Sequence, residues 1–271
     1  MAEGRFSLDG KVALVTGGAG ILGRRFCRGL ADQGAAVAIV DIDGKGAERL
    51  ASEIARETGK KTLAVACDLR DPKQVAAMVD KVVKLFGRID VLHNNAAGKS
   101  EDPDAFFATF EDYSLEQWRA IMALDLDTMF LVAQAVGRHM VARGGGGSVV
   151  QTASIYGVVA PDPRIYAGSL YQGRAINTPA VYAVAKAGVI GLTRYLAAYW
   201  APQGIRVNAL TPGGVESGQN DTFRKLYAAR VPLGRMGEAD EMVGALVWLA
   251  SDASSYVTGQ NIVIDGGLSV W

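Results

Sequence analysis

The chain has 271 residues, of which 49% are hydrophobic, with 28 basic and 28 acidic side chains. This length suits one domain with an ample core, 1–271, and the sequence shows no linker or internal repeat. The balanced charge excludes the basic excess that is typical of nucleic-acid-binding proteins.

The cysteines and histidines favour a reduced protein without a metal. Cys27 and Cys67 each lie in apolar sequence, which predicts small buried side chains rather than a disulfide. His93 and His139 have no partner cysteine, so we expect no metal site. The N-terminus lacks a signal-peptide pattern, and apolar windows of membrane-spanning length are interrupted by charged or polar residues. We therefore expect a cytoplasmic protein with no membrane partner.

Short β-branched runs alternate with helix-length segments along the chain. Each run is apolar on both faces, as strands buried in a parallel sheet must be. The predicted strands are 11–16, 36–41, 62–68, 89–95, 147–154, 205–212 and 260–267. This alternation predicts an α/β fold with a doubly wound sheet and right-handed crossovers.

Start and stop signals mark several of the predicted helices. One helix begins near residue 21 and is closed by Gly34, and another begins with Asp71 as N-cap and Pro72 at its first position. The glycines at 144–147 predict a turn that ends a long helix before the fifth strand.

A glycine pattern follows the first strand directly. Gly18, Gly20 and Gly23 form G-x-G-x-x-G at the start of a helix, where glycines let the backbone approach a pyrophosphate. Asp41 ends the second strand, and its carboxylate can accept hydrogen bonds from a ribose while repelling a 2′-phosphate. Arg24 and Arg25 follow the last glycine, and we expect them on the outer side of the helix. The pattern predicts an NAD site.

Seven motifs in a fixed order resemble the short-chain dehydrogenase/reductase family over essentially the whole chain. They are "TGGAGILG" (16–23), "CDL" (67–69), "NNAAG" (94–98), Ser154, "YAVAK" (182–186), "IRVNALTPGG" (205–214) and "VTGQNIVIDGG" (257–267). The resemblance implies a seven-stranded Rossmann sheet, NAD(P)-dependent oxidoreduction, catalytic Ser, Tyr and Lys residues, and a homotetramer.

The resemblance also implies cofactor-binding residues. Asn94 would support the cofactor side of the sheet, Asp68 and Leu69 would flank the adenine, and Pro212 and its neighbours would border the nicotinamide. The full implied set is Gly17, Gly18, Gly20, Ile21, Leu22, Gly23, Asp41, Ile42, Asp68, Leu69, Asn95, Ala96, Tyr182, Lys186, Pro212, Gly213, Val215 and Ser217.

The Tyr-x-x-x-Lys pair supports the same chemistry independently. A phenol with a pKa near 10 is a poor base at neutral pH. Lys186 lies one helical turn after Tyr182 on the same face, and its ammonium would favour the phenolate. Tyr182 could then exchange a proton with an alcohol or ketone oxygen, which Ser154 would hold by a hydrogen bond.

The sequence departs from the pattern of the short family branch in its glycine spacing and at one catalytic position. The spacing "TGGAGILG" is more usual in the long branch, which carries a C-terminal substrate domain. Because the chain ends six residues after Asp265, we expect no such domain and favour the short single-domain branch. The fourth catalytic position, usually an asparagine that helps hold a relay water, is Asp125 here.

An unusually long, irregular segment separates Ser154 from Tyr182, which are 28 positions apart. The extra residues, about 162–177, are expected to loop over the carboxyl end of the sheet and to wall the substrate site, although a solvent loop or a subunit contact is an alternative. The candidate substrate contacts are Ser154, Tyr156, Arg164 and Tyr166, with Tyr171 and Arg174 nearby. Residues 213–237 form a second candidate substrate loop, in which Glu216 and Arg230 are possible contacts.

The leading hypothesis is an NAD-dependent oxidoreductase that acts on a polar, sugar-like or sugar-acid alcohol or ketone. The segment from 154 to 166 weakly resembles gluconate 5-dehydrogenase-like and surface-glycan sugar oxidoreductases. Alternatives are a 3-oxoacyl-type ketoreductase, which would favour NADPH, and a nucleotide-binding regulator without turnover, which would be expected to lose Tyr182 or Lys186.

Overall fold

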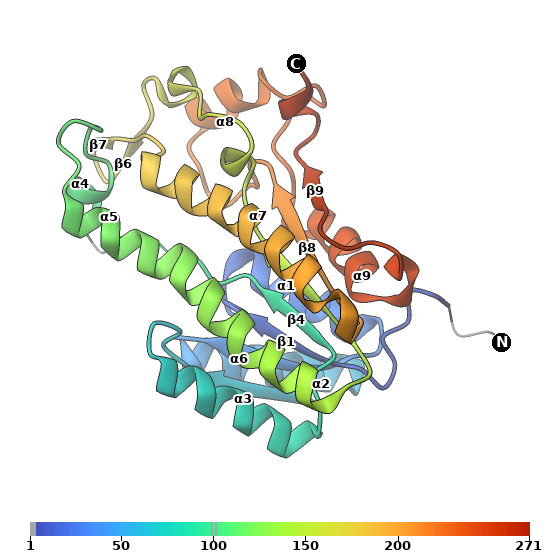
Figure 1. Ribbon diagram of the computed structural model, residues 1–271. Helices are drawn as coiled ribbons and strands as arrows, with labels where there is room; N and C mark the ends of the chain where they lie inside the picture. Colours follow the sequence, from blue (N-terminus) through green and yellow to red (C-terminus); the bar gives the residue numbers. More distant parts are fainter. Residues whose placement is uncertain (1–3, 99, 101) are drawn as a thin grey trace.

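A computed structural model describes residues 4–98, 100 and 102–271. Its main sheet has seven parallel strands in the order β3-β2-β1-β4-β5-β8-β9 (Figure 1). The strands are β1 (Val12–Thr16), β2 (Ala36–Asp41), β3 (Thr62–Ala66), β4 (Val91–Asn94), β5 (Gly147–Thr152), β8 (Ile205–Pro212) and β9 (Asn261–Ile264). The predicted seven-stranded, doubly wound Rossmann fold is confirmed. Strand order reverses between β1 and β4, the position where such sheets bind ligands.

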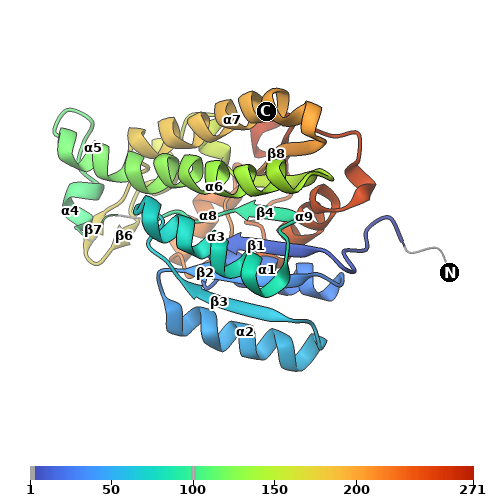
Figure 2. The same ribbon diagram turned by 60° about the horizontal axis from the view of Figure 1, so that its bottom comes forward.

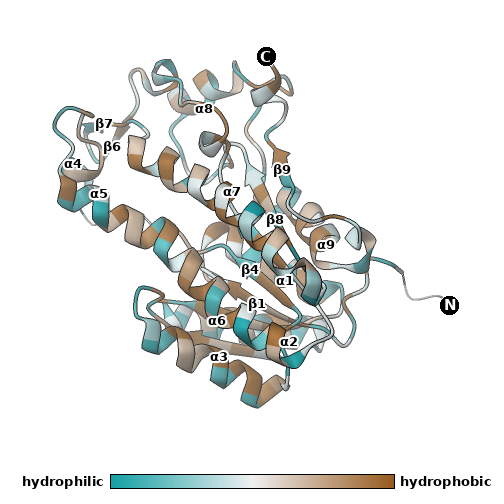
Figure 3. Cartoon of the chain, in the orientation of Figure 1, coloured by the Kyte–Doolittle hydropathy of each residue, from teal (hydrophilic) through white to brown (hydrophobic). Residues whose placement is uncertain are grey.

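Helices cover both faces of this sheet. α1 (Ile21–Asp32), α2 (Gly44–Thr58) and α9 (Val243–Ala250) pack on one face through a core that includes Phe26, Ile39 and Leu246. α3 (Pro72–Phe86), α6 (Thr128–Arg143) and α7 (Ala180–Trp200) pack on the other, side by side in Figure 2. The strands are largely hydrophobic, and hydrophilic residues are frequent on the surrounding helices (Figure 3). Both faces of the sheet are thus withdrawn from water, as the sequence predicted.

The predicted helix boundaries are found at the expected residues. The Asp71 side chain accepts a hydrogen bond from the Lys73 N–H, and Pro72 opens α3. Gly34 has φ +106° just after α1, and Gly144 has φ +72° after α6, so each adopts a conformation that other residues rarely enter.

α5 (Leu115–Met122) continues through a π-helical turn, Ala123–Asp127, into α6. The resulting helix, Leu115–Arg143, is the one helix of the described residues that is long and apolar enough to cross a membrane by length and composition alone. Met129, Val132 and Val136 of this helix are fully buried in the core, which accounts for its apolar character. The π turn also carries Asp125, which is completely buried.

The insertion is more ordered than its sequence indicated. Residues 163–166 form a 3₁₀ turn, and β6 (Leu170–Tyr171) pairs with β7 (Arg174–Ala175) as an antiparallel hairpin. The hairpin lies beside α4 (Pro103–Phe106) in Figures 1 and 2, where Arg174 forms an ion pair with Asp104. α8 (Asp221–Ala228) lies within the second candidate loop.

Candidate active site

The glycine loop between β1 and α1 has no room for side chains. Gly17 has φ +63°, and a Cβ at that position would lie 2.9 Å from the Ala96 Cα. A Cβ at Gly23 would lie 1.9 Å from the Gly17 carbonyl oxygen, and one at Gly18 would lie 2.7 Å from Ile39. The loop therefore needs these glycines to bring the backbone of β1 close to the N-terminus of α1, which fits the binding of a dinucleotide pyrophosphate.

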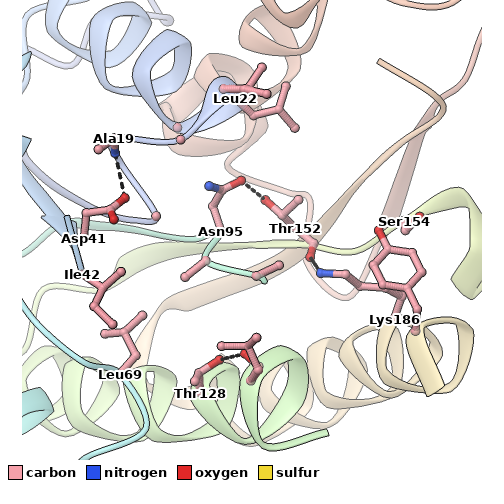
Figure 4. A pocket seen from close by; sticks show the side chains of 18 of the residues that line it. Ala19, Leu22, Asp41, Ile42, Leu69, Asn95, Thr128, Thr152, Ser154 and Lys186 are labelled. Carbon is pink, nitrogen blue, oxygen red and sulfur yellow. Dashed lines mark hydrogen bonds between the residues drawn. The ribbon is translucent and has the colours of Figure 1, made fainter. Parts of the chain in front are cut away.

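Asp41 joins the end of β2 to this loop. Its Oδ2 accepts a hydrogen bond of 2.9 Å from the Ala19 N–H, which is visible in Figure 4, and its Oδ1 accepts one of the same length from the Asp43 N–H. The carboxylate is thus held at the mouth of the loop with a fixed orientation. Arg24 donates to the Ala19 carbonyl at 3.0 Å, whereas Arg25 pairs with Asp240 at 3.6 Å. Arg25 therefore points away from the loop, but Arg24 remains near it.

A cavity of about 1060 Å³ extends from this loop along the carboxyl ends of the strands. All the cofactor-binding residues implied by the family resemblance line it, apart from Gly18, whose N–H donates to the Val40 carbonyl behind the loop. Its lining also includes the catalytic candidates Ser154, Tyr182 and Lys186. Near Leu69, the Asp68 carboxylate accepts hydrogen bonds from Arg70, which hold the pKa of Asp68 below its usual range. The residues present fit a nicotinamide dinucleotide.

Strand-end hydroxyls, which the sequence analysis did not single out, brace the centre of the cavity. Thr16 Oγ1 accepts from the backbone N–H of Asn95 at 2.8 Å and of Ala96 at 3.1 Å. Thr152 Oγ1 donates to Asn95 Oδ1 at 3.1 Å (Figure 4). Their positions in the sequence could have identified them. Thr16 ends the first strand and opens the glycine motif, and Thr152 ends the strand that precedes Ser154. Asn94 lies deeper and donates to the Met129 carbonyl at 2.8 Å, which joins β4 to α6.

Ser154, Tyr182 and Lys186 come together at the end of β5 and on the first turns of α7. Lys186 Nζ lies 5.7 Å from the centre of the Tyr182 ring and donates to the Thr152 carbonyl at 3.4 Å. Burial raises the pKa of Tyr182, and a hydrogen bond with Ser154 lowers it. Burial also lowers the pKa of Lys186. Figure 4 shows Ser154 and Lys186 at the same end of the cavity. The 28 positions between serine and tyrosine therefore do not separate them in space.

Asp125 lies behind this group. Its Oδ1 accepts a hydrogen bond of 3.0 Å from the Gly98 N–H, on the loop that follows β4. Burial raises the pKa of Asp125, and the charge of Lys186 lowers it. Asp125 does not line the cavity, so any action on the reaction would pass through Lys186 or the Gly98 loop.

The candidate substrate tyrosines form a half-buried chain of hydroxyl groups. Tyr166 Oη donates to Tyr156 Oη at 3.4 Å and also contacts the Thr178 hydroxyl. Burial raises the pKa of both phenols. Neither tyrosine lines the large cavity. Tyr156 also lines a second, smaller cavity of about 100 Å³.

The arginines of the two candidate substrate segments all have acidic partners. Arg164 is exposed and forms a bidentate pair with Asp162, which also contacts Arg230. Arg174 pairs with Asp104. None of these three arginines lines the large cavity. Their role as contacts to a charged substrate stays a prediction.

Tyr227 of α8 was missed by the sequence analysis. The Gly214 N–H donates to its phenol oxygen, and a Cβ at Gly214 would lie 2.5 Å from its ring. Tyr227 therefore fixes the backbone next to Gly213 and Val215, two of the cofactor-binding candidates. Sequence alone gave no signal for it, because a tyrosine on an amphipathic helix is ordinarily a core residue.

In residues 4–98, 100 and 102–271, no group of three or more His, Cys, Asp or Glu side chains is placed to hold a metal ion. Cys27 and Cys67 are free and buried. His93 is also buried, and its Nε2 contacts Thr152 Oγ1 at 2.9 Å. Because Thr152 donates its proton to Asn95, the His93 nitrogen must carry the hydrogen of that contact.

Known proteins resemble this chain over nearly its full length. A family model described as enoyl-(acyl carrier protein) reductase matches residues 17–269. A D-threitol dehydrogenase of Mycolicibacterium smegmatis is 37% identical, covering 98% of this chain and 95% of that protein. A 3-oxoacyl-[acyl-carrier-protein] reductase of Thermotoga maritima is 36% identical over 97% of this chain and 99% of that protein.

A solved structure extends the similarity to three dimensions. The gluconate 5-dehydrogenase of Burkholderia cenocepacia, crystallised with NADP and tartrate, has a TM-score of 0.86 and 36% identity, with full coverage of both chains.

Proposed function

The chain belongs to the short-chain dehydrogenase/reductase family and is an oxidoreductase; from this premise we propose that it interconverts a secondary alcohol and a ketone on a polyhydroxylated substrate, with NAD(H) as cofactor. The observation that carries the proposal is the convergence of Ser154, Tyr182 and Lys186 at one end of the dinucleotide-sized cavity.

The bound nicotinamide would accept the hydride in the oxidation direction and supply it in reduction. Ser154 is placed to hold the substrate oxygen by a hydrogen bond. Tyr182 takes the proton of that oxygen in oxidation and returns it in reduction. Lys186 keeps a positive charge beside the phenol and thereby opposes the rise in the pKa of Tyr182 that burial causes.

The choice of NAD(H) rests on Asp41. Both of its oxygens are oriented by backbone N–H groups, so the carboxylate stays at the place where an adenosine ribose would be bound. A 2′-phosphate there would meet a negative charge. Two observations oppose this choice: Arg24 lies near the loop, and the similar gluconate 5-dehydrogenase was crystallised with NADP. Titration of the protein with NADH and NADPH by fluorescence tests the proposal, and tighter NADPH binding would contradict it.

A neutral polyol is favoured over an anionic sugar acid. Arg174 pairs with Asp104, and Arg164 and Arg230 share the carboxylate of Asp162, so each of these three guanidinium groups already has a carboxylate partner inside the protein. We assign to the hydrogen-bonded phenols of Tyr156 and Tyr166 the pairing with substrate hydroxyls, because a phenol can both donate and accept a hydrogen bond. The D-threitol dehydrogenase supports a polyol, whereas the gluconate 5-dehydrogenase supports a sugar acid.

The substrate class can be tested by following NADH formation with a panel of C4–C6 polyols and the matching aldonic acids. We expect higher kcat/KM with the polyols. A clear preference for the acids would contradict the assignment of the arginines to internal ion pairs, while leaving the dehydrogenase chemistry intact.

A 3-oxoacyl thioester reductase is the second candidate, favoured by the similarity to the Thermotoga maritima enzyme. It predicts NADPH preference and reduction of an acetoacetyl thioester. The Asp41 carboxylate and the hairpin insertion oppose it. A regulator without turnover is opposed by the intact Tyr182 and Lys186 pair.

We propose a homotetramer in the cytoplasm. Tyr195 and Tyr199 are both more than 60% exposed on α7 and stack with ring centroids 5.9 Å apart, and Phe130 is exposed on the adjacent α6. Large exposed aromatic groups on neighbouring helices are typical of a subunit interface. Light scattering at micromolar concentration tests this, and a monomer there would contradict it.

A further inference from the structure

A buried carboxylate oxygen has no hydrogen-bond partner near the catalytic group. Asp125 is completely buried, and while its Oδ1 accepts from Gly98, its Oδ2 has no partner within the described part of the chain. Lys186 is also buried, and its hydrogen bond to the Thr152 carbonyl is long at 3.4 Å. Two groups of opposite charge are thus withdrawn from water with incomplete hydrogen bonding, a combination that is costly unless each charge compensates the other.

The π turn places these groups near each other. The turn packs directly on α7, where a Cβ at Gly188 would lie 2.9 Å from the Leu126 side chain. The extra residue of a π turn projects Asp125 inward, and such turns are frequent at functional sites. Asp127, two residues later in the same turn, is exposed.

We propose that Asp125 is a positioning residue that carries a negative charge behind Lys186 and sets the pH range over which Tyr182 gives up its proton. The inference deepens the proposed function, because it rests on the roles of Tyr182 and Lys186 given above. It assigns to Asp125 an electrostatic role that a neutral amide at this position could not perform.

Within residues 4–98, 100 and 102–271, the titratable groups that act on Asp125 are Lys186 and Tyr182 on α7, and the Gly98 N–H donates to it from the loop after β4. The Asp125 charge opposes the burial that lowers the pKa of Lys186, so it keeps the ammonium protonated to higher pH. It also raises the pKa of Tyr182, because a nearby anion disfavours the phenolate. Removal of the charge should therefore lower both pKa values and move the activity profile toward acid.

The first test needs no substrate. The ultraviolet difference spectrum of the wild-type protein minus Tyr182→Phe follows the ionisation of Tyr182 across pH, and the same difference is recorded in the Asp125→Asn background. We expect the tyrosinate transition to begin about one pH unit lower in Asp125→Asn. Superimposable transitions would overturn the proposal, whatever the substrate of the enzyme proves to be.

Asp125→Asn is nearly isosteric and retains an oxygen for the Gly98 N–H, so the fold should be preserved. Asp127→Asn removes the same charge from an exposed position of the same turn and serves as the matched control, for which we expect no shift. An equal shift in both variants would indicate a general charge effect and would also overturn the proposal.

Kinetics then separate positioning from structural damage. In the oxidation direction, both limbs of the kcat/KM profile of Asp125→Asn should move to lower pH by a similar amount, with the maximal kcat within about tenfold of wild type. A drop in activity at every pH without a shift would contradict the electrostatic role.

Discussion

The cofactor-binding loops and the two candidate substrate segments are built differently. The cofactor side, formed by residues 16–23, 41–43, 67–70 and 94–97, lies at the ends of buried strands and is held by backbone hydrogen bonds and close glycine contacts. The substrate side, as we call the candidate segments 162–177 and 213–237, consists of a hairpin, short helices and ion pairs at the surface, although Gly213, Val215 and Ser217 at its start line the cofactor cavity. The Arg174 and Asp104 side chains are 41% and 66% exposed, so that pair contributes little stability.

This difference predicts which side tolerates change. The cofactor side has no room for an added side-chain atom, because backbone atoms of the glycine loop already contact one another and Ala96. The substrate side can vary in length and sequence while the sheet stays intact, and specificity in a fold of this kind is therefore expected to depend on its loops.

The largest effect is expected on the cofactor side. Gly23→Ala should weaken NADH binding about 100-fold, because the new Cβ would lie 1.9 Å from the Gly17 carbonyl oxygen and the loop would have to move. Gly244→Ala, whose Cβ meets no atom within 4 Å, is the matched control and should bind NADH normally. Isothermal titration calorimetry measures both. Normal affinity in Gly23→Ala would show that the glycine loop is not the pyrophosphate cradle.

A smaller change is expected at Asp41. Asp41→Ser removes the carboxylate that would repel a 2′-phosphate, so the ratio of NADPH to NADH affinity should rise about tenfold. An unchanged ratio, measured by fluorescence titration of both cofactors, would mean that Asp41 only braces the loop through Ala19 and Asp43.

On the substrate side, replacement of the hairpin residues 170–175 by a short glycine linker should raise the substrate KM several-fold. The 3₁₀ turn before it is best kept, because Ile165 is 4% exposed and packs in a cluster with Phe223 and Tyr227. NADH affinity should not change, since no hairpin residue lines the cofactor cavity. If substrate kinetics stay constant and the oligomer dissociates, the hairpin is an interface element.

The smallest effect is expected for the ion pair that joins the hairpin to α4. In a double-mutant cycle of Arg174→Ala and Asp104→Ala, the coupling energy in thermal unfolding should be below about 1 kcal/mol. A coupling of several kcal/mol would show that this part of the substrate side is as firmly held as the cofactor side.

The difference between the cofactor side and the substrate side also explains which features could be predicted from the sequence. The seven strands, the caps at Asp71 and Gly34, and the lining of the cavity by Gly17, Asp41 and their neighbours follow from local patterns, because buried parallel strands and glycine loops have few alternatives. The partners of Arg174 and Arg230 could not be predicted, because these ion pairs depend on how loops from distant parts of the chain meet.

Long-range placement also explains the residues that were missed. Tyr227 and Gly214 are 13 positions apart and meet only because α8 folds back on the loop after β8. The π turn gave no signal in the sequence, although it determines the burial of Asp125. The hairpin at 170–175 was equally unforeseen, since its two strands have only two residues each.

The central claim is that Tyr182 exchanges the proton of the substrate oxygen while the cofactor side binds independently of it. Tyr182→Phe removes only the phenol oxygen, so NADH affinity should remain within about twofold of wild type, whereas kcat should fall by about 10²–10⁴. Both values can be measured on one preparation, by NADH fluorescence titration and by NADH formation with the best polyol of the panel. Turnover close to wild type in Tyr182→Phe would contradict the account.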